Sequence, residues 1–91
     1  MNTKTVFLRN SAAAWQQVEN NIVVVTPQTR KIHILSGCGT RIWQLLEVPQ
    51  TREGIVNALV DEFEVEQSIA EQQTKDFLAE LKGKNILIVK E

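Results

Sequence analysis

The sequence contains one cysteine and one histidine, and these residues are the best suited to chemistry. His33 lies in a stretch with strand character and Cys38 follows shortly after it, so a thiol and an imidazole could lie close together. A nucleophilic pair also needs a third group that orients the base. No aspartate or asparagine nearby is an obvious orienting group. The sequence therefore predicts no catalytic residue and no enzymatic activity; Cys38 should pack at a helix start, and His33 should lie at a groove or surface.

Metal and cofactor sites are not expected either. One cysteine and one histidine cannot supply the ligands of a zinc site, and neither a CxxC nor an HExxH motif occurs. Glu62, Glu64 and Glu66 lack the spacing of a calcium-binding EF-hand loop. The segment Gly37-Cys38-Gly39 has glycines but lacks the lysine that follows a phosphate-binding loop. The sequence predicts no metal and no cofactor.

The elements that position these residues follow from the hydrophobic pattern. Alternating and β-branched residues predict three strands, with turns at Asn20-Asn21 and Pro27–Arg30, and helical spacing predicts three helices after them. The strands are expected at 13–18, 22–26 and 31–35, and the helices at 40–47, 51–63 and from 67 or 68 to a stop at Gly83 or Asn85, with short arms at 6–8 and 86–89. This order predicts an α+β, winged-helix-like fold: a three-stranded antiparallel sheet followed by a three-helix bundle, in a single domain at 1–91.

Core and cap positions follow from the same pattern. Thr51 is expected to cap the second helix, although Gly54 leaves its capping box incomplete, and Ser36 or Thr40 is expected to cap the first. In the third helix, either Ile69 or Ala70 should begin the apolar stripe. Trp43 is expected in the core or at an interface. The other core positions are Ile42, Leu45, Leu46, Leu59, Phe77, Leu78 and Leu81, and Ile55, Val56, Val60 and Phe63 recur with Leu59 at helical spacing.

Charge and composition indicate which classes of binding partner are expected. Residues 1–46 carry a net charge of +4 and residues 47–91 a net charge of −5, so the strands are basic and the helices acidic. A winged helix that regulates DNA is the alternative function, but the third helix carries Glu71, Asp76 and Glu80, which would repel phosphates. No nucleic acid and no membrane partner is expected. A lone cysteine and the absence of a signal peptide predict a cytoplasmic protein.

The most informative feature is the third strand, 31–35, whose entrance carries Arg30 and Lys31. An unpaired edge strand can recruit an extended peptide, and positive charge beside it would favour an acidic one. A lysine on an edge also protects a sheet from unwanted pairing, and the residues alone leave these two interpretations nearly equal. Because its edge is unpaired, the protein could be either a monomer or a strand-swapped dimer.

Four stretches together resemble a known family. They are Asn21–Pro27, Thr29–Ser36, the segment Gly39-Thr40-Arg41-Ile42-Trp43-Gln44-Leu45-Leu46, and Thr51–Val56 with Phe77, Leu78 and Leu81. Their order and spacing are similar to those of the PqqD-like family, the recognition elements of ribosomally made, post-translationally modified peptides. The chain departs from the family at Gly37-Cys38, and at Ile32 and His33, where aromatic residues are common.

This resemblance implies a mechanism. The leader of a precursor peptide would add as an extra strand to the third strand and lie in a groove bounded by the third helix. The module would then present the precursor to a modifying enzyme, often a radical SAM enzyme, and catalyse nothing itself. Carried onto this chain, the peptide-binding residues are Arg30, Lys31, Ile32, His33, Ile34 and Leu35 on one wall, and Gln72, Gln73, Asp76, Phe77 and Glu80 on the other.

Overall fold

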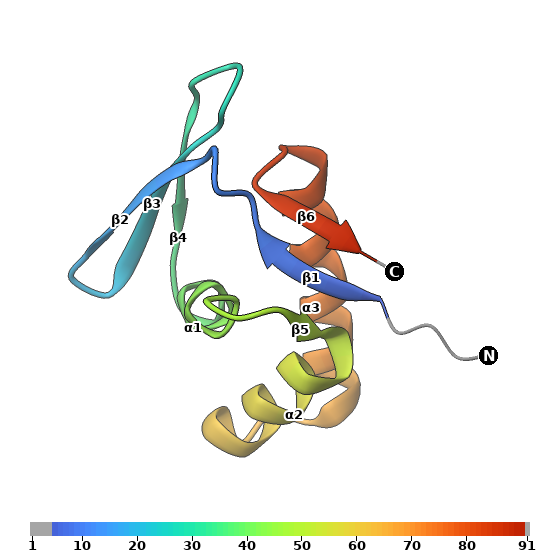
Figure 1. Ribbon diagram of the computed structural model, residues 1–91. Helices are drawn as coiled ribbons and strands as arrows, with labels where there is room; N and C mark the ends of the chain where they lie inside the picture. The colour runs from blue at the N-terminus through green and yellow to red at the C-terminus, as the bar shows by residue number, and fades with distance from the viewer. Residues whose placement is uncertain (1–4, 91) are drawn as a thin grey trace.

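The computed structural model of the 91-residue chain describes residues 5–90, which form two small sheets and three helices (Figure 1). The strands are β1 (Val6–Arg9), β2 (Ala14–Val18), β3 (Asn21–Val25), β4 (Ile32–Leu35), β5 (Gln50–Thr51) and β6 (Leu87–Lys90), and the helices are α1 (Cys38–Leu45), α2 (Arg52–Phe63) and α3 (Gln67–Gly83). The predicted antiparallel sheet of three strands and the three predicted helices are confirmed.

The sheet β2-β3-β4 is a meander of neighbouring strands. Its side chains alternate between two faces, as the pleat requires. Ile22 and Val24 of β3 point into the core and are fully buried, whereas Val23 and Val25 lie on the opposite, outer face. The turn between β2 and β3 lies one residue earlier than expected: Glu19 and Asn20 form it, and Asn21 already belongs to β3.

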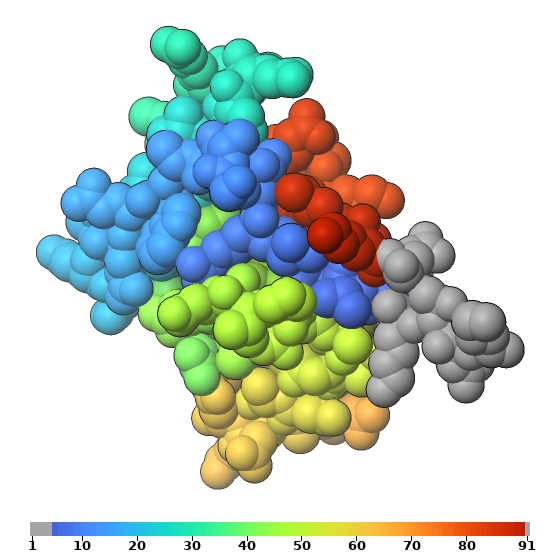
Figure 2. Space-filling view, in the orientation of Figure 1, coloured from blue at the N-terminus to red at the C-terminus, as the bar shows by residue number. Residues whose placement is uncertain are grey.

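A second sheet, β5-β1-β6, was not predicted. The two arms expected at 6–8 and 86–89 pair with each other in antiparallel register, from Val6 opposite Lys90 to Arg9 opposite Leu87. A two-residue strand, β5, pairs with the other edge of β1. Figures 1 and 2 show β1 and β6 side by side on one face of the molecule, far apart though they are in the sequence. Pairing between strands from the two ends of the chain cannot be predicted from the periodicity within either segment.

The helix ends agree with the expected caps in part. The Thr51 hydroxyl accepts a bond from the Gly54 N–H at 3.1 Å, so Thr51 caps α2 as predicted. Helix α1 begins at Cys38, two residues before the predicted start, and Thr40 does not cap it. The Thr40 hydroxyl instead donates to the carbonyls of Asn20 and Leu35, which ties α1 to the sheet. Helix α3 extends to Gly83, and Asn85 follows with a positive φ of 62°.

The core lies where the β2-β3-β4 sheet meets the helices. Trp43 is fully buried at its centre, which decides between the two roles expected for it. Ala70, not Ile69, belongs to the buried stripe of α3. Phe63 continues the helical spacing of the apolar residues in α2, but at the last residue of the helix it is 42% exposed. Leu45 and Phe77 pack against the core but are only partly buried. The buried hydrophobic cluster is Ala13, Ile22, Val24, Leu35, Ile42, Trp43, Leu46, Ile55, Val56, Leu59, Ala70, Leu78, Leu81, Ile86 and Leu87.

Candidate functional site

The candidate site begins at β4, because among residues 5–90 this strand has a partner on one side only. It pairs with β3 from Ile22 opposite Leu35 to Val25 opposite Ile32, and the sheet ends there. Next to this ladder, the Thr26 N–H donates to the Lys31 carbonyl at 2.9 Å. Backbone groups of an antiparallel strand point alternately towards and away from the partner strand. It follows that His33 and Leu35 bond to β3, while the N–H and C=O groups of Ile32 and Ile34 face the free edge.

The side chains of β4 alternate in the same way. Leu35 is buried in the core and His33 is partly buried, both on the face towards the helices. The side chains of Ile32 and Ile34 lie on the outer face, 67% and 66% exposed. An exposed isoleucine pair on an edge strand, without a charged residue within the strand, does not protect that edge against pairing.

The strand β4 is positioned at both ends. A tight turn joins it to β3: the Arg30 N–H donates to the Thr26 carbonyl, and Arg30 has a positive φ of 57°. The hydroxyls of Thr26 and Thr29 bond to each other, and the Lys31 N–H donates to the Thr26 hydroxyl at 2.8 Å. After Leu35 the chain reverses at Gly37, whose φ of 59° suits a residue without a side chain. Both ends of the edge are therefore fixed locally.

Helix α3 and Lys84, the residue that follows it, form the other side of the predicted groove. An added Cβ at Gly39, the second residue of α1, would lie 2.9 Å from Cε1 of Phe77, so the Phe77 ring lies against the start of α1. The Lys84 ammonium lies 3.3 Å from Nδ1 of His33 in β4. Residues 73, 77, 80 and 84 share one face of a helix by their spacing. Gln73 and Glu80 therefore lie on the same side of α3 as Phe77.

The structure does not bring all the predicted residues to this side. Gln72 lines a different hollow, between α2 and α3, and its amide donates to both carboxylate oxygens of Asp76. Both side chains of that pair are exposed. Lys84, in contrast, was missed by sequence reasoning. Its position four residues after Glu80, a spacing that permits an ion pair, was the available signal.

The charges near the free edge are mainly positive. Arg30 and Lys31 are exposed at the entrance of β4, as expected, and Lys84 approaches His33 from just beyond the end of α3. Glu80 is the acid beside them, and its carboxylate lies 2.7 Å from the Lys84 ammonium. Arg41, in α1, is occupied elsewhere: it forms a two-bond ion pair with Glu62 of α2, at 2.7 and 3.0 Å. Those hydrogen bonds raise the pKa of Arg41 and lower the pKa of Glu62.

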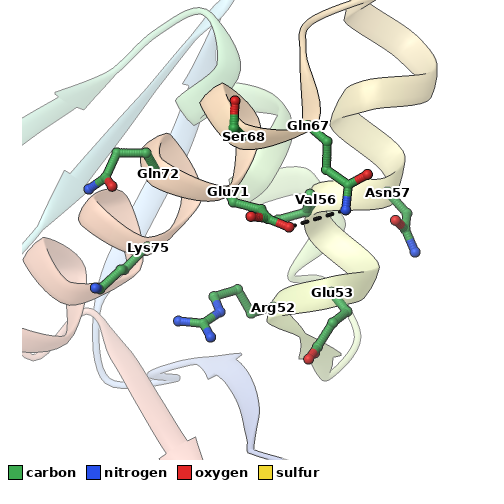
Figure 3. A pocket seen from close by; sticks show the side chains of 9 residues that line it. All are labelled: Arg52, Glu53, Val56, Asn57, Gln67, Ser68, Glu71, Gln72 and Lys75. Carbon is green, nitrogen blue, oxygen red and sulfur yellow. Dashed lines mark hydrogen bonds between the residues drawn. The ribbon is translucent and has the colours of Figure 1, made fainter.

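The hollow between α2 and α3 is one of several that flank α3, with a volume of about 360 Å³ (Figure 3). Gln67 donates to Glu71 inside it, and Figure 3 shows Arg52 and Lys75 extending from neighbouring helices towards the same space. Its charges balance, with two basic and two acidic side chains in its lining. Its full lining is Arg52, Glu53, Val56, Asn57, Gln67, Ser68, Glu71, Gln72 and Lys75.

Across residues 5–90, no three histidine, cysteine, aspartate or glutamate side chains gather closely enough to hold a metal ion. Cys38 is partly buried and packs against the core at the start of α1, as expected. No helix formed by residues 5–90 is long and apolar enough to span a membrane.

Comparison with known proteins adds a family and two solved structures. The family model described as coenzyme PQQ synthesis protein D (PqqD) matches residues 21–87. The structure titled "TbiB1 in Complex with the TbiA(beta) Leader Peptide" is 31% identical, with a TM-score of 0.81 over 88% of this chain and 93% of that chain. The structure titled "Lasso peptide synthetase B1 complexed with the leader peptide" is 20% identical, with a TM-score of 0.77 over 90% and 96% of the two chains. No curated protein sequence matches this chain.

Proposed function

Because this chain belongs to the family of the coenzyme PQQ synthesis protein D, we propose that it binds the leader of a precursor peptide. TbiB1, the 31% identical protein whose fold it shares, was solved with a leader peptide bound. In this proposal the leader adds as a fourth strand to the free edge of β4, beside α3. Of the peptide-binding residues predicted from the sequence, those from Arg30 to Leu35 and Gln73, Phe77 and Glu80 of α3 are proposed for this contact.

The observation that carries the proposal is the alternation of backbone groups in β4. Ile32 and Ile34 each present one N–H and one C=O to the free edge, so an added strand gains up to four backbone bonds there. At about 1 kcal/mol net for each bond, less the cost of ordering the peptide, backbone pairing alone is weak. Side-chain contacts must therefore supply specificity and much of the affinity, and the partly buried Phe77 ring is the apolar contact available beside the edge.

The second part of the proposal concerns the partner enzyme. We propose that the module presents the bound precursor to a separate modifying enzyme, of which a radical SAM enzyme is one class, and that it catalyses no step itself. The composition of the candidate site supports a binding role, since it consists of a strand edge, an aromatic ring and a cluster of basic side chains. Duplex DNA binding has no such support, because Glu71, Asp76 and Glu80 all lie on α3.

Two proline substitutions in β4 test strand addition. We expect Ile34→Pro to fold, because it removes an N–H that faces the free edge, and to lose at least about tenfold in peptide affinity. His33→Pro is the matched variant, because it removes an N–H that bonds to β3 and should destabilise the sheet. The probe is a displayed library of random extended peptides, selected on the parent and on Ile34→Pro, followed by anisotropy titrations of the enriched peptides.

The outcomes separate clearly. Circular dichroism must show that Ile34→Pro retains the folded spectrum of the parent. If the parent enriches no peptides beyond those that Ile34→Pro also captures, leader binding by strand addition is wrong for this protein. If His33→Pro folds as well as the parent and Ile34→Pro does not fold, the assignment of the outward groups is wrong.

A further inference from the structure

A hollow of about 280 Å³ lies at one end of the free edge, between the turn that follows β3 and the end of α3. Three basic side chains line it: Lys31 and His33 from the sheet, and Lys84 from just beyond α3. No carboxylate belongs to its lining among the residues that the structure describes. The complete lining is Thr26, Pro27, Gln28, Thr29, Lys31, His33, Gly83, Lys84 and Asn85. This hollow differs from the one between α2 and α3, where acids and bases balance.

Lys84 connects the two walls of this hollow. Its ammonium lies 2.7 Å from the Glu80 carboxylate and 3.3 Å from Nδ1 of His33. An ammonium has three donors and no acceptor, so in this contact Lys84 is the donor and Nδ1 of His33 is the acceptor. One donor of Lys84 then remains for a ligand. The Lys84 side chain is 33% exposed and that of Glu80 is 59% exposed, so the ion pair itself is open to water and weak.

In an added strand, one peptide side chain would point towards Lys84 and His33. Side chains directly opposite each other in paired strands lie on the same face of the sheet. His33 points to the inner face, towards α3, as its contact with Lys84 shows. The peptide residue opposite His33 therefore directs its side chain towards His33 and Lys84, and the residues before and after it point to the outer face with Ile32 and Ile34.

We infer that the hollow beside His33 and Lys84 is a subsite for one carboxylate side chain, aspartate or glutamate, of the bound leader. The inference rests on the proposed function, and it names the chemistry and the position of one specificity-determining contact. The incoming carboxylate accepts from the free donor of Lys84, with Lys31 adding charge from the sheet side. Glu80 acts as a positioning residue, because its ion pair holds Lys84 against β4 before the peptide arrives.

The test compares peptide selection on charge variants of α3 and its end. A displayed library of random extended peptides is selected on the parent, on Lys84→Glu and on Lys75→Glu. Lys75→Glu is the matched control, since it makes the same charge change on α3 but lines the hollow next to α2. We expect the parent to enrich aspartate and glutamate at one fixed position, Lys84→Glu to exchange them for lysine and arginine there, and Lys75→Glu to behave as the parent does.

A titration then measures the contact directly. For an enriched peptide with glutamate at that position, replacement of the glutamate by glutamine should weaken binding to the parent about three- to tenfold. The same replacement should change binding to Lys84→Gln by less than about twofold. Absence of an acidic position in the parent's peptides, or an unchanged glutamate preference in Lys84→Gln, overturns the subsite alone. Failure to enrich any peptide over Ile34→Pro overturns the proposed function, and the subsite with it.

Discussion

Arg9 shows at the scale of a single residue how the two sheets are joined. Its guanidinium lies 4.6 Å from the ring centre of Trp15 and 4.8 Å from that of Trp43, so it contacts both indoles, which themselves meet edge to face with ring centres 5.7 Å apart. It also donates twice to the Trp43 carbonyl. Burial lowers the pKa of Arg9, and the nearby Glu47 opposes that effect. The indole N–H of Trp43 is buried without a partner among the described residues, so packing and stacking hold the ring.

This arrangement predicts the effect of removing the guanidinium. Arg9→Met should lower the free energy of unfolding by about 1–3 kcal/mol, because two cation–π contacts and the bonds to a carbonyl are lost while apolar volume is kept. Urea unfolding followed by tryptophan fluorescence measures it, since both indoles report on the site. Arg9→Lys is the control, because it keeps the charge but not the planar donors. Its free energy of unfolding should lie between those of the parent and Arg9→Met. Equal stability of Arg9→Met and the parent would contradict this role.

At the scale of elements, the contact between α1 and α3 links the fold to the candidate site. Gly39 lets α1 approach Phe77 closely: an added Cβ would lie 2.9 Å from Cε1 and 3.2 Å from Cζ of the ring. The atoms it would meet belong to the far end of a side chain that is only partly buried. The ring can therefore move, and it can only move away from α1.

Gly39→Ala should consequently weaken peptide binding more than it weakens the fold. The displaced Phe77 ring should reduce affinity for a selected peptide about three- to tenfold, while the overpacking cost of about 1–3 kcal/mol is partly offset by the higher helix propensity of alanine. Anisotropy and thermal unfolding measure the two effects separately. Gly83→Ala is the control for stability, because nothing lies within 4 Å of its added Cβ. Unchanged peptide affinity in a folded Gly39→Ala protein would remove Phe77 from the proposed groove.

At the scale of the whole molecule, the division of charge in the sequence becomes a division in space. The basic half of the chain, residues 1–46, forms β1 to β4 and all of α1, and the acidic half forms β5, α2, α3 and β6. Arg30 and Lys31 lie at the turn between β3 and β4, which projects from the body of the molecule (Figures 1 and 2). Exposed charges in such a place act on approaching ligands from a distance more than they add contact energy.

The double variant Arg30→Glu with Lys31→Glu should therefore slow the association of an acidic peptide. At low salt we expect association about tenfold slower than in the parent, and the difference should shrink as salt screens the charges. Stopped-flow anisotropy at two salt concentrations measures this rate. Arg52→Glu provides the control, because Arg52 begins α2 and lines the hollow between α2 and α3, away from β4. A variant that changed only the dissociation rate, without salt dependence, would indicate direct contacts in place of steering.

Local chemistry in the sequence determined the strands and helices themselves. The β-branched run at 22–26, the turn residues at 27–30 and the threonine cap at 51 act within a few neighbours, so their structure follows from their types. The residues indicated the strand at 31–35 as an exposed edge, and the family resemblance implied that a peptide binds there. The start of α1 was placed two residues late because Gly37, with its positive φ, begins the helix without a side-chain cap.

Tertiary structure alone decided the contacts between residues far apart in the chain. The pairing of β1 with β6, the ion pair between Arg41 and Glu62, and the approach of Lys84 to His33 depend on how elements pack, and no local period encodes that packing. The direction of the backbone groups at Ile32 and Ile34 likewise required the register of β4 on β3, because a shift of one residue would turn every group to the other side. The sequence could therefore nominate an edge, and only the fold could determine which atoms of that edge remain available to a peptide.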